Sequence, residues 1–249
     1  MWKISSFLKK VWTSFLDFLF PPLCLGCSSH VRSWGEFCST CWASTVFIVH
    51  PFCDQCGVPF DIEVDERTLC VSCLTDPKAF SKVRSCFLYN DISKKIVLSL
   101  KNHDKTQLAP YMAKFMEQSG QDLIQNADIV TIVPLHWKRL FKRKFNQAAL
   151  VLRYIKTPGI KIYDLLQRTK HTQYQGSLHK DERQKNVKKS FAFTTEYKNA
   201  IRGKTVLIID DVITTGSTLH ECAKVLIKSG AKEVWGLSWA RTKEHFYKD

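Results

Sequence analysis

Two adjacent carboxylates, Asp210 and Asp211, stand between an apolar run and a run of small residues. The apolar run, residues 206–209, is typical of a buried strand. Hydroxyl groups and backbone amides at the start of a helix bind phosphate, and a glycine lets the backbone approach it closely. Two carboxylates beside a phosphate suit the vicinal hydroxyls of a sugar, and a bound Mg²⁺ would relieve their repulsion. The pattern predicts a sugar-phosphate site, with a plain acidic turn as the alternative; its phosphate cradle comprises Thr214, Thr215, Gly216, Ser217 and Thr218.

Eight of the ten cysteines form four CxxC pairs near the start of the chain. Each CxxC turn points two thiolates at one ion, and two turns complete a tetrahedral zinc site that has no open position for catalysis. The alternative is a disulfide framework, which needs an oxidising compartment, and the sequence shows no export signal. We therefore predict two structural Zn²⁺ ions, paired either sequentially or in a cross-braced manner, on Cys24, Cys27, Cys38, Cys41, Cys53, Cys56, Cys70 and Cys73.

The elements that must position the sugar-phosphate site follow the cysteines. Apolar and β-branched runs predict strands at residues 83–89, 129–133, 205–209 and 234–240, and helical spacing predicts helices at 93–101, 107–117, 146–155 and 218–229. Alternating strands and helices predict an α/β fold, a mostly parallel sheet with helices on both faces. Ligands of such sheets bind beyond the carboxyl ends of the strands, where the two carboxylates are expected.

The charge is divided unevenly along the chain. Residues 1–80 carry six Lys/Arg and eight Asp/Glu, a net charge of −2, whereas residues 81–249 carry 31 and 15, a net charge of +16. This asymmetry predicts two modules with those bounds and a polyanionic partner for the second.

Residues 1–20 have the spacing of an amphipathic helix that ends before Pro21. Packing of this helix on its own protein is the favoured interpretation, and peripheral contact with a membrane surface is the alternative. Because no segment reaches the ~18 uninterrupted apolar residues of a spanning helix, we expect a cytoplasmic protein, with the inner membrane surface as the alternative location.

Residues 206–218 resemble the signature of type I phosphoribosyltransferases, which bind 5-phosphoribosyl-1-pyrophosphate (PRPP). More of the chain resembles one subgroup, the ComF family of competence-associated proteins, in which a double zinc ribbon precedes a phosphoribosyltransferase-like sheet. Its landmarks are FLFPPLC (18–24), CDQCG (53–57), LK (100–101), VPLHWKRLFKRKFNQA (133–148), RTKHTQYQ (168–175) and ERQKNVKKSF (182–191). Two departures are Lys144, where the family usually has glycine, and residues 102–104, where it usually has aromatic residues and glycine.

The resemblance implies a role for each loop around the site. Asp210 and Asp211 would hold the ribose hydroxyls of Mg²⁺-bound PRPP, and residues 214–218 would hold its 5′-phosphate. Lys101 is a further site residue. The pyrophosphate loop would comprise Pro134, Leu135 and His136, with Lys138 and Arg139 as countercharge, and a mobile closing loop would carry Arg168, Gln175 and Arg183. Thr214 replaces the third acid of 6-oxopurine salvage enzymes, so carboxylate assistance of a purine is not expected, and no residue specifies an acceptor base.

A basic stretch with interleaved aromatic residues suggests a second ligand. Residues 138–189 contain 15 Lys/Arg and three acidic residues. Single-stranded nucleic acid is held by positive charge on its phosphates and by aromatic rings on its bases. The alternative is a solvated face with the aromatic residues in the core. We predict DNA contacts from Trp137, Lys142, Arg143, Lys144 and Phe145.

The family resemblance favours a competence protein that handles single-stranded DNA during natural transformation and binds PRPP in its phosphoribosyltransferase-like domain. Its expected partners are PRPP or a related phosphoribosyl ligand, single-stranded DNA and other DNA-uptake proteins. The alternative is an active phosphoribosyltransferase that moves phosphoribose from PRPP to an unidentified nitrogen acceptor, and the sequence does not decide whether turnover occurs.

Overall fold

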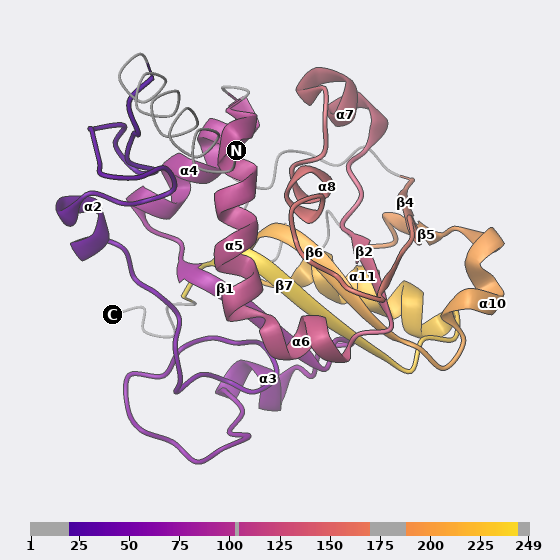
Figure 1. Ribbon diagram of the computed structural model, residues 1–249. Coiled ribbons are helices and arrows are strands. Elements are labelled where there is room, and N and C mark those ends of the chain that lie inside the picture. The colour runs from indigo at the N-terminus through magenta and orange to yellow at the C-terminus, as the bar shows by residue number, and fades with distance from the viewer. Residues whose placement is uncertain (1–19, 103–104, 170–187, 244–249) are drawn as a thin grey trace, which may run out of the picture. The chain divides into compact units, whose positions relative to one another are not determined.

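A computed structural model of the 249-residue chain describes residues 20–102, 105–169 and 188–243 (Figure 1). The contacts divide the chain into two compact units, residues 1–45 and 46–249. The second cysteine module therefore belongs to the larger unit, while the predicted boundary between residues 80 and 81 stays a prediction. Nearly all of the predicted helix at residues 1–20 lies outside the described residues. Within the described part of the chain, no helix combines the length and apolarity needed to cross a membrane.

The described part of the smaller unit consists of two turns and one short helix. An antiparallel bridge joins Leu23 to His30, and α2 (Ser39–Ala43) follows a turn. The Cys38 side chain caps α2 by accepting a hydrogen bond from the backbone N–H of Cys41. Cysteines therefore determine where α2 begins, because Cys38 caps this helix and Cys41 lies within it.

The larger unit contains a five-stranded parallel sheet with the order β1-β7-β6-β2-β3. A separate antiparallel pair, β4 with β5, lies outside it. The prediction of a mostly parallel sheet is confirmed. The strands are β1 (Lys82–Leu88), β2 (Ile129–Ile132), β3 (Lys161–Ile162), β4 (Leu166–Arg168), β5 (Phe191–Phe193), β6 (Thr205–Ile213) and β7 (Glu233–Arg241).

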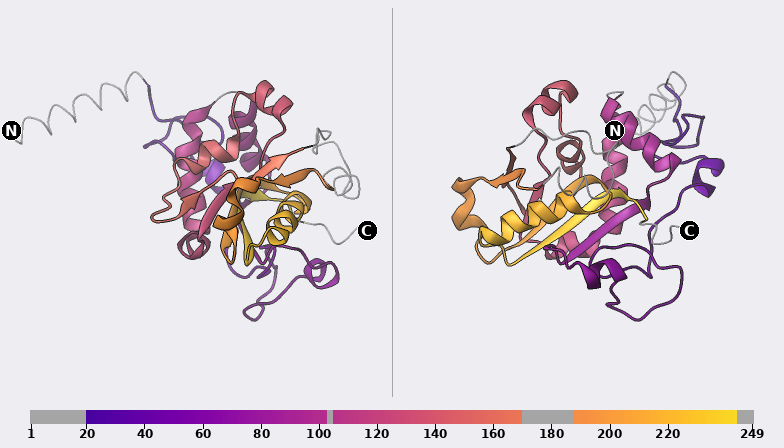
Figure 2. Two further views of the ribbon diagram at one scale, coloured as in Figure 1. Left: turned by 90° about the vertical axis from the view of Figure 1, so that its right-hand side faces the viewer. Right: turned by 180° about the vertical axis from the view of Figure 1, so that it is seen from behind.

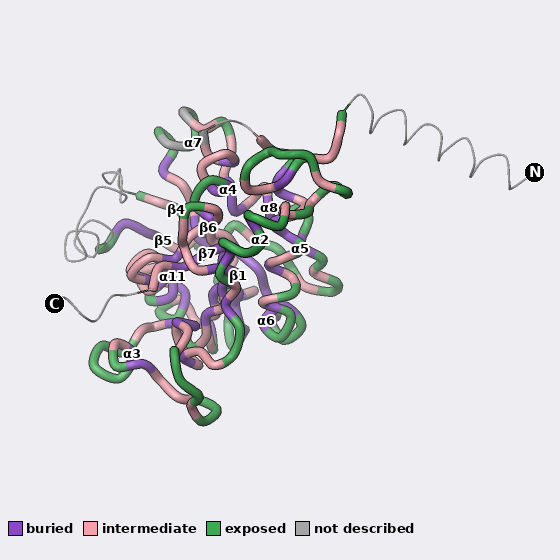
Figure 3. Tube along the Cα trace, turned by 90° about the vertical axis from the view of Figure 1, so that its left-hand side faces the viewer, coloured by how far each residue is buried: buried purple, intermediate pink, exposed green. Residues whose placement is uncertain are grey.

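Helices cover both faces of this sheet, as predicted. Figure 1 shows α5 in front of the strands, and the reverse view in Figure 2 shows α11 on the opposite face. The exposed loop before α3 is green in Figure 3. The α-helices of the unit are α3 (Val71–Thr75), α4 (Asp91–Asn102), α5 (Ala109–Ser119), α6 (Gln121–Asn126), α7 (Trp137–Arg143), α8 (Gln147–Leu152), α10 (Lys198–Ile201) and α11 (Ser217–Lys228), with 3₁₀ turns η1 (Thr106–Leu108) and η3 (Thr195–Tyr197).

The central strand β6 is longer than predicted. We expected it to end at Ile209, but it continues to Ile213 because β7 pairs with it as far as that residue. Its other neighbour, β2, pairs only as far as Ile209. Asp210 and Asp211 therefore lie inside a strand that is held on one side and open on the other.

The outer edge of β1 is covered by the segment that enters the larger unit. Ile48 donates a backbone hydrogen bond to Cys86, and Leu88 donates one to Val46, so residues 46–48 lie antiparallel beside β1. The Phe87 ring is fully buried there and packs against Trp239, with their centroids 4.5 Å apart. This segment therefore belongs to the core of the larger unit.

Lys144 occupies a backbone conformation that favours glycine. It is the C-cap of α7, with φ of 64° in the left-handed region. Helices commonly end with glycine in this conformation because other residues place Cβ too close to the backbone. This geometry explains why the family usually has glycine at this position, and it shows that lysine is retained there against a steric cost.

We expect Lys144→Gly to stabilise the protein by about 1 kcal/mol, because relief of the left-handed strain exceeds the extra entropy of the unfolded chain. Urea denaturation followed by circular dichroism measures the difference. The matched control is Lys142→Gly, which removes the same charge from a helical position and should destabilise by about 1 kcal/mol. Equal effects of the two substitutions would contradict this explanation.

Candidate functional site

A cavity of about 460 Å³ opens at the carboxyl end of the sheet. Its walls come from the end of β6, the start of α11, one face of α4, the loop after β2 and the end of β4. This is the position at which parallel sheets bind their ligands. The cavity therefore gathers residues that are far apart in the sequence.

The two carboxylates lie in this cavity in different environments. Lys101 Nζ lies 2.6 Å from Asp211 Oδ2, and both side chains are mostly buried. Asp210 is also partly buried, and its Oδ1 accepts a hydrogen bond of 2.8 Å from the backbone N–H of Asp211. Burial, followed by repulsion from the Asp211 carboxylate, raises the pKa of Asp210 from 3.8 to about 7. The pair therefore carries a readily neutralised acid beside one held in an ion pair.

The loop between β6 and α11 is split between two cavities. Thr214, Gly216, Ser217 and Thr218 line the large cavity, whereas Thr215 lines a small cavity on the other side together with Gly216. Thr215 Oγ1 and Ser217 Oγ are 2.7 Å apart, so the two hydroxyls brace the turn. Because this turn begins the 12-residue helix α11, its backbone amides stand at the positive end of a helix dipole.

Gly216 is required by the conformation of this turn. Its φ is 72°, in the left-handed region, and a Cβ built there would lie 3.5 Å from the ring of Phe80. A Cβ at this position would point toward the buried Phe80. The backbone conformation therefore restricts this position more than direct contact with a ligand.

Cationic side chains outnumber the carboxylates in the cavity. Lys94, Leu98 and Lys101 line it from one face of α4, because residues four and three apart lie on the same side of a helix. Asn90 starts α4 by accepting backbone hydrogen bonds from Ile92 and Ser93. The cavity contains the lysines of α4 together with Arg143 and Arg168, so it suits a ligand with several negative charges.

Of the described side chains in the predicted pyrophosphate loop, that of Leu135 lines the cavity, as does the preceding residue Val133. His136 is buried and caps α7, since its Nδ1 accepts a 3.3 Å hydrogen bond from the backbone N–H of Lys138. This geometry gives His136 a structural role. The side chain of Lys138 is exposed beside the Trp137 ring, and that of Arg139 lies outside the described residues, as does that of Lys142. Pro134 is half-buried.

Asn146, Gln147 and Tyr89 also line the cavity, although the sequence interpretation did not select them. Asn146 caps α8 by accepting from the backbone N–H of Ala148, and its Nδ2 donates to the Val133 carbonyl at 3.0 Å. The signal for Asn146 was present, because asparagine before an apolar helical run is a common N-cap. It therefore ties the loop after β2 to the start of α8.

The predicted closing loop is described only at its start. Arg168 ends β4 and lines the cavity, and its guanidinium lies 5.2 Å from the centre of the Phe191 ring. Gln175 and Arg183 lie outside the described residues.

The helix α7 presents aromatic residues to solvent beside this cavity. Trp137 is 66% exposed and Phe141 is 88% exposed, and their spacing of four residues places them on one face. We also predicted DNA contacts from Phe145 and Arg143. Phe145 is half-buried, so less of its ring is exposed than in Trp137 or Phe141, and Arg143 lines the cavity. Phe141 was therefore overlooked as a candidate, although its spacing from Trp137 could have identified it.

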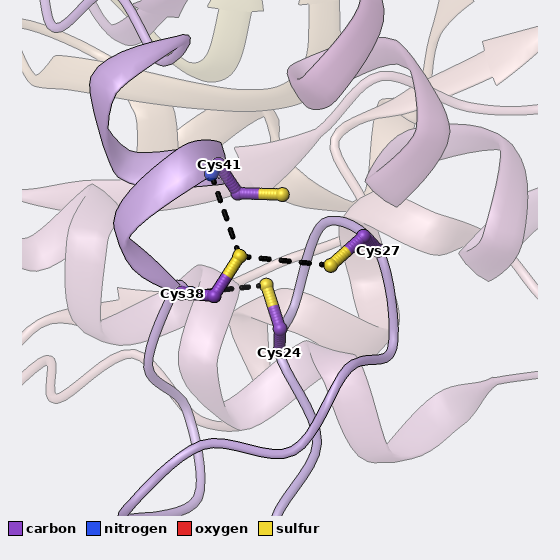
Figure 4. A group of neighbouring side chains, drawn as sticks. All are labelled: Cys24, Cys27, Cys38 and Cys41. Carbon is purple, nitrogen blue, oxygen red and sulfur yellow. Dashed lines mark hydrogen bonds between the residues drawn. The ribbon is translucent and has the colours of Figure 1, made fainter.

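The eight paired cysteines form two separate tetrads with sequential pairing. Cys24, Cys27, Cys38 and Cys41 form the first, drawn in Figure 4, and the second contains Cys53, Cys56, Cys70 and Cys73. In each tetrad all the Sγ atoms lie within 4.8 Å of one another. The Sγ atoms of Cys27 and Cys38 are 3.6 Å apart, as are those of Cys56 and Cys70.

These distances fit a metal ion better than disulfides. Tetrahedral zinc with Zn–S bonds of ~2.3 Å separates its sulfur ligands by ~3.8 Å, whereas a disulfide needs ~2.05 Å. Backbone N–H groups also point at the sulfurs, as those of Cys38 and Cys70 do at 3.2 and 3.3 Å from Cys24 and Cys53. Both tetrads therefore suit structural zinc, with all four positions supplied by protein.

The raised pKa of Asp210 generates a prediction for the unliganded protein. The unfolded chain releases the Asp210 proton near pH 4 and the folded protein near pH 7, so this residue makes folding less favourable as pH rises across that range. Asp210→Asn removes the ionisable group and with it this loss of folding stability at high pH. The variant should be more stable than the wild type at pH 8, by up to ~4 kcal/mol, and should lose this advantage at pH 4.

Thermal denaturation across a pH series measures this effect. The control is Asp128→Asn, because the Thr205 backbone N–H and Lys204 lower the pKa of Asp128. That variant should be less stable than the wild type at pH 8, the opposite sign. A destabilised Asp210→Asn variant at pH 8 would contradict the electrostatic description of the pair.

Comparison with known protein families identifies both modules. Residues 15–74 match the double zinc ribbon domain, and residues 161–235 match the phosphoribosyl transferase domain. Among solved structures, a hypoxanthine-guanine phosphoribosyltransferase from Bacillus anthracis covers 58% of this chain and 75% of its own, with 18% identity and a TM-score of 0.37. That structural likeness is too weak to carry an argument about function.

Relatives extend over most of the chain. Competence protein F of Haemophilus influenzae is 27% identical over 229 residues, which are 88% of this chain and 90% of that protein. The DNA utilization protein YhgH of Salmonella typhimurium is 29% identical over 228 residues, 87% of this chain and 96% of that protein. Because these alignments cover nearly nine-tenths of this chain, the resemblance is not limited to either module. Over most of its length, this chain is therefore similar to competence proteins of the ComF family.

Proposed function

We propose that this protein acts in the handling of single-stranded DNA during natural transformation and binds PRPP, with Mg²⁺, in the cavity at the carboxyl end of the sheet. The observation that carries the PRPP proposal is the convergence of the β6–α11 turn, the two carboxylates and four cationic side chains on one cavity. PRPP carries a 5′-phosphate and a 1-pyrophosphate, both highly charged, on a sugar with vicinal hydroxyls. Each of these chemical groups has a complement among the lining residues.

In this proposal the turn at 214–218 receives the 5′-phosphate and the carboxylates receive the ribose hydroxyls. Lys101 already neutralises Asp211, so Asp210 carries the remaining repulsion. A bound divalent cation would favour the ionised form of Asp210, and carboxylate oxygens are suitable ligands in the neighbourhood of Mg²⁺. Lys94, Arg143 and Arg168 are available in the same cavity as countercharge for pyrophosphate.

The alternative function, transfer of phosphoribose to a nitrogen acceptor, would use the same cavity. Leu98, Leu135 and Tyr89 supply apolar surface against which a planar acceptor could lie. Thr214 replaces the acid that would assist a purine. Release of pyrophosphate from Mg²⁺–PRPP, with a candidate acceptor present, distinguishes turnover from binding alone.

The DNA part of the proposal rests on α7. Large aromatic side chains as exposed as Trp137 and Phe141 are unusual as neighbours on one helix face, and such patches commonly mark an interaction surface. Lys138 Nζ lies 5.5 Å from the Trp137 ring centre, and Lys144 is exposed at the end of the helix. Rings that stack on bases and cations that contact phosphates are the two requirements for binding single strands.

The names of the relatives support the same biological setting. One is a competence protein, and another is called a DNA utilization protein. The first name refers to competence and the second to the utilization of DNA. Association with other DNA-uptake proteins, and contact of residues 1–20 with the inner membrane surface, are further parts of this proposal.

We expect Mg²⁺–PRPP to raise the melting temperature of the wild type, because a ligand that binds only the folded state stabilises it by mass action. Asp210→Asn combined with Asp211→Asn should abolish this shift. The control is Asp164→Asn, which removes an exposed carboxylate that does not line the large cavity. Differential scanning fluorimetry with and without PRPP gives the result, and an unchanged shift in the double variant would overturn the site assignment.

Trp137→Ala combined with Phe141→Ala should weaken binding of a single-stranded oligonucleotide, by about 1–3 kcal/mol for each base that stacks. The loss should persist at high salt, where phosphate contacts have weakened. Fluorescence anisotropy across a salt series measures it. Tyr154→Ala is the matched control, since Tyr154 is 49% exposed but lies outside α7.

The same variants also separate DNA binding from PRPP binding. Neither Trp137 nor Phe141 lines the cavity, so the double variant should keep its response to PRPP. If the double variant keeps wild-type affinity for DNA and Tyr154→Ala loses affinity, α7 is not part of the DNA site. Binding of a protein partner instead of DNA would then become the better explanation of the exposed rings.

A further inference from the structure

The turn proposed to hold phosphate has a second side that does not face the large cavity. There, Thr215 and Gly216 line a small cavity of about 20 Å³. The opposite wall of that cavity contains three members of the second cysteine tetrad, Cys56, Cys70 and Cys73. The β6–α11 turn and the second cysteine tetrad therefore lie on either side of the same small cavity inside the larger unit.

Phe80 fills the space between them. Its side chain is 2% exposed, and its ring lies where a Cβ on Gly216 would contact it at 3.5 Å. Phe80 is held from the ribbon side, because Gln55 Nε2 donates to its carbonyl at 2.9 Å. Gln55 stands between Cys53 and Cys56 in the CxxC turn. The position of the ring thus depends on the turn that carries two tetrad cysteines.

Two more contacts join the ribbon to the sheet, one at the start of β1 and one from the end of β7. Gly57, with φ of 71°, approaches β1 so closely that a Cβ would lie 2.4 Å from the Val83 carbonyl oxygen. Arg241, a buried residue at the end of β7, donates from Nη1 to the carbonyl of Cys56. No side chain could be inserted at Gly57 without separating the two parts.

The linker after the tetrad also contacts α11. Ala79 donates its backbone N–H to His220 Nδ1 at 2.9 Å, and His220 donates its own N–H to the Gly216 carbonyl at 2.8 Å. Hydrogen bonds therefore run from the linker through the first turn of α11 to the glycine of the turn. The first tetrad lies in the other compact unit, residues 1–45.

We propose that the second zinc ribbon positions the turn at 214–218, with Phe80 as the positioning residue, and that zinc in the second tetrad is required for full PRPP affinity whereas zinc in the first is not. This inference rests on the proposed PRPP function. A four-cysteine site acquires much of its folding free energy from its metal. Loss of zinc from the second tetrad would release the Gln55 turn and with it the ring beneath Gly216.

A matched pair of substitutions tests the proposal in the full-length protein. Cys41 and Cys73 are both buried, each is the last cysteine of its tetrad, and each is the third residue of a five-residue helix. Cys41→Ser and Cys73→Ser should each lower the zinc content, measured by mass spectrometry, from two ions per chain to about one. Only Cys73→Ser should weaken PRPP binding, by about tenfold or more in isothermal titration calorimetry, because only that variant loses the support of the turn.

Amide hydrogen exchange of residues 214–218 gives a readout that does not require PRPP. Exchange should accelerate in unliganded Cys73→Ser and stay at the wild-type rate in Cys41→Ser. A Cys73→Ser protein that has lost one zinc ion but keeps wild-type exchange would overturn the inference. If the wild type itself binds no PRPP, the proposed function fails, and the exchange rates still decide whether the ribbon positions the turn.

If Cys73→Ser does not fold, Phe80→Leu provides a second test of the proposal. Leucine keeps the site apolar but is too short to fill the space beneath Gly216. This variant should retain two zinc ions and show both faster exchange at 214–218 and weaker PRPP binding. Phe60→Leu is its control, because Phe60 packs against the second ribbon but does not line the small cavity beneath the turn. Equal PRPP affinity in Phe80→Leu and the wild type would contradict the role of Phe80.

Discussion

The site depends on a difference in length between two neighbouring strands. Backbone pairing of β2 with β6 stops at Ile209, while pairing of β7 with β6 continues to Ile213. One side of β6 is therefore free to face a ligand, and the other side holds the backbone rigid. Adjacent carboxylates repel each other, and on a flexible loop they would move apart. On a strand that is paired on one side, Asp210 and Asp211 stay beside the cavity, and the repulsion appears as the raised pKa of Asp210.

The two cysteine tetrads share a ligand pattern but differ in their surroundings. The first is enclosed in a unit of its own, where Cys27 is exposed. The second contacts the main core through Cys56, the start of β1 through Gly57 and the end of β7 through Arg241. A closed four-cysteine site offers zinc no open coordination position, so neither tetrad is suited to catalysis. The two tetrads differ in what surrounds them: the first lies in the smaller unit, and the second packs against the core of the larger unit.

The sequence predicted the features that depend on local pattern. Apolar periodicity identified β1, β2, β6, β7 and α11, but not the two-residue strand β3. CxxC spacing identified the eight cysteines of the two tetrads, because neighbouring residues determine these patterns. The end of β6 was wrong by four residues, since it depends on pairing with β7. The helix α7 was missed because its charged and aromatic residues resemble a basic loop in sequence. Sequential zinc pairing and the contact of Phe80 with Gly216 could not be derived, because they depend on long-range packing.

Residues 46–48 have a consequence for how this protein can be divided. They hydrogen-bond along β1, which otherwise would be an unprotected outer strand of the sheet. A fragment that begins at residue 81, where the charge changes along the sequence, would lack this cover and expose a row of unpaired N–H and carbonyl groups. Such edges pair readily between molecules, so that fragment is prone to aggregation even if its sheet forms. A fragment that begins at Val46 keeps this edge covered and coincides with the larger compact unit.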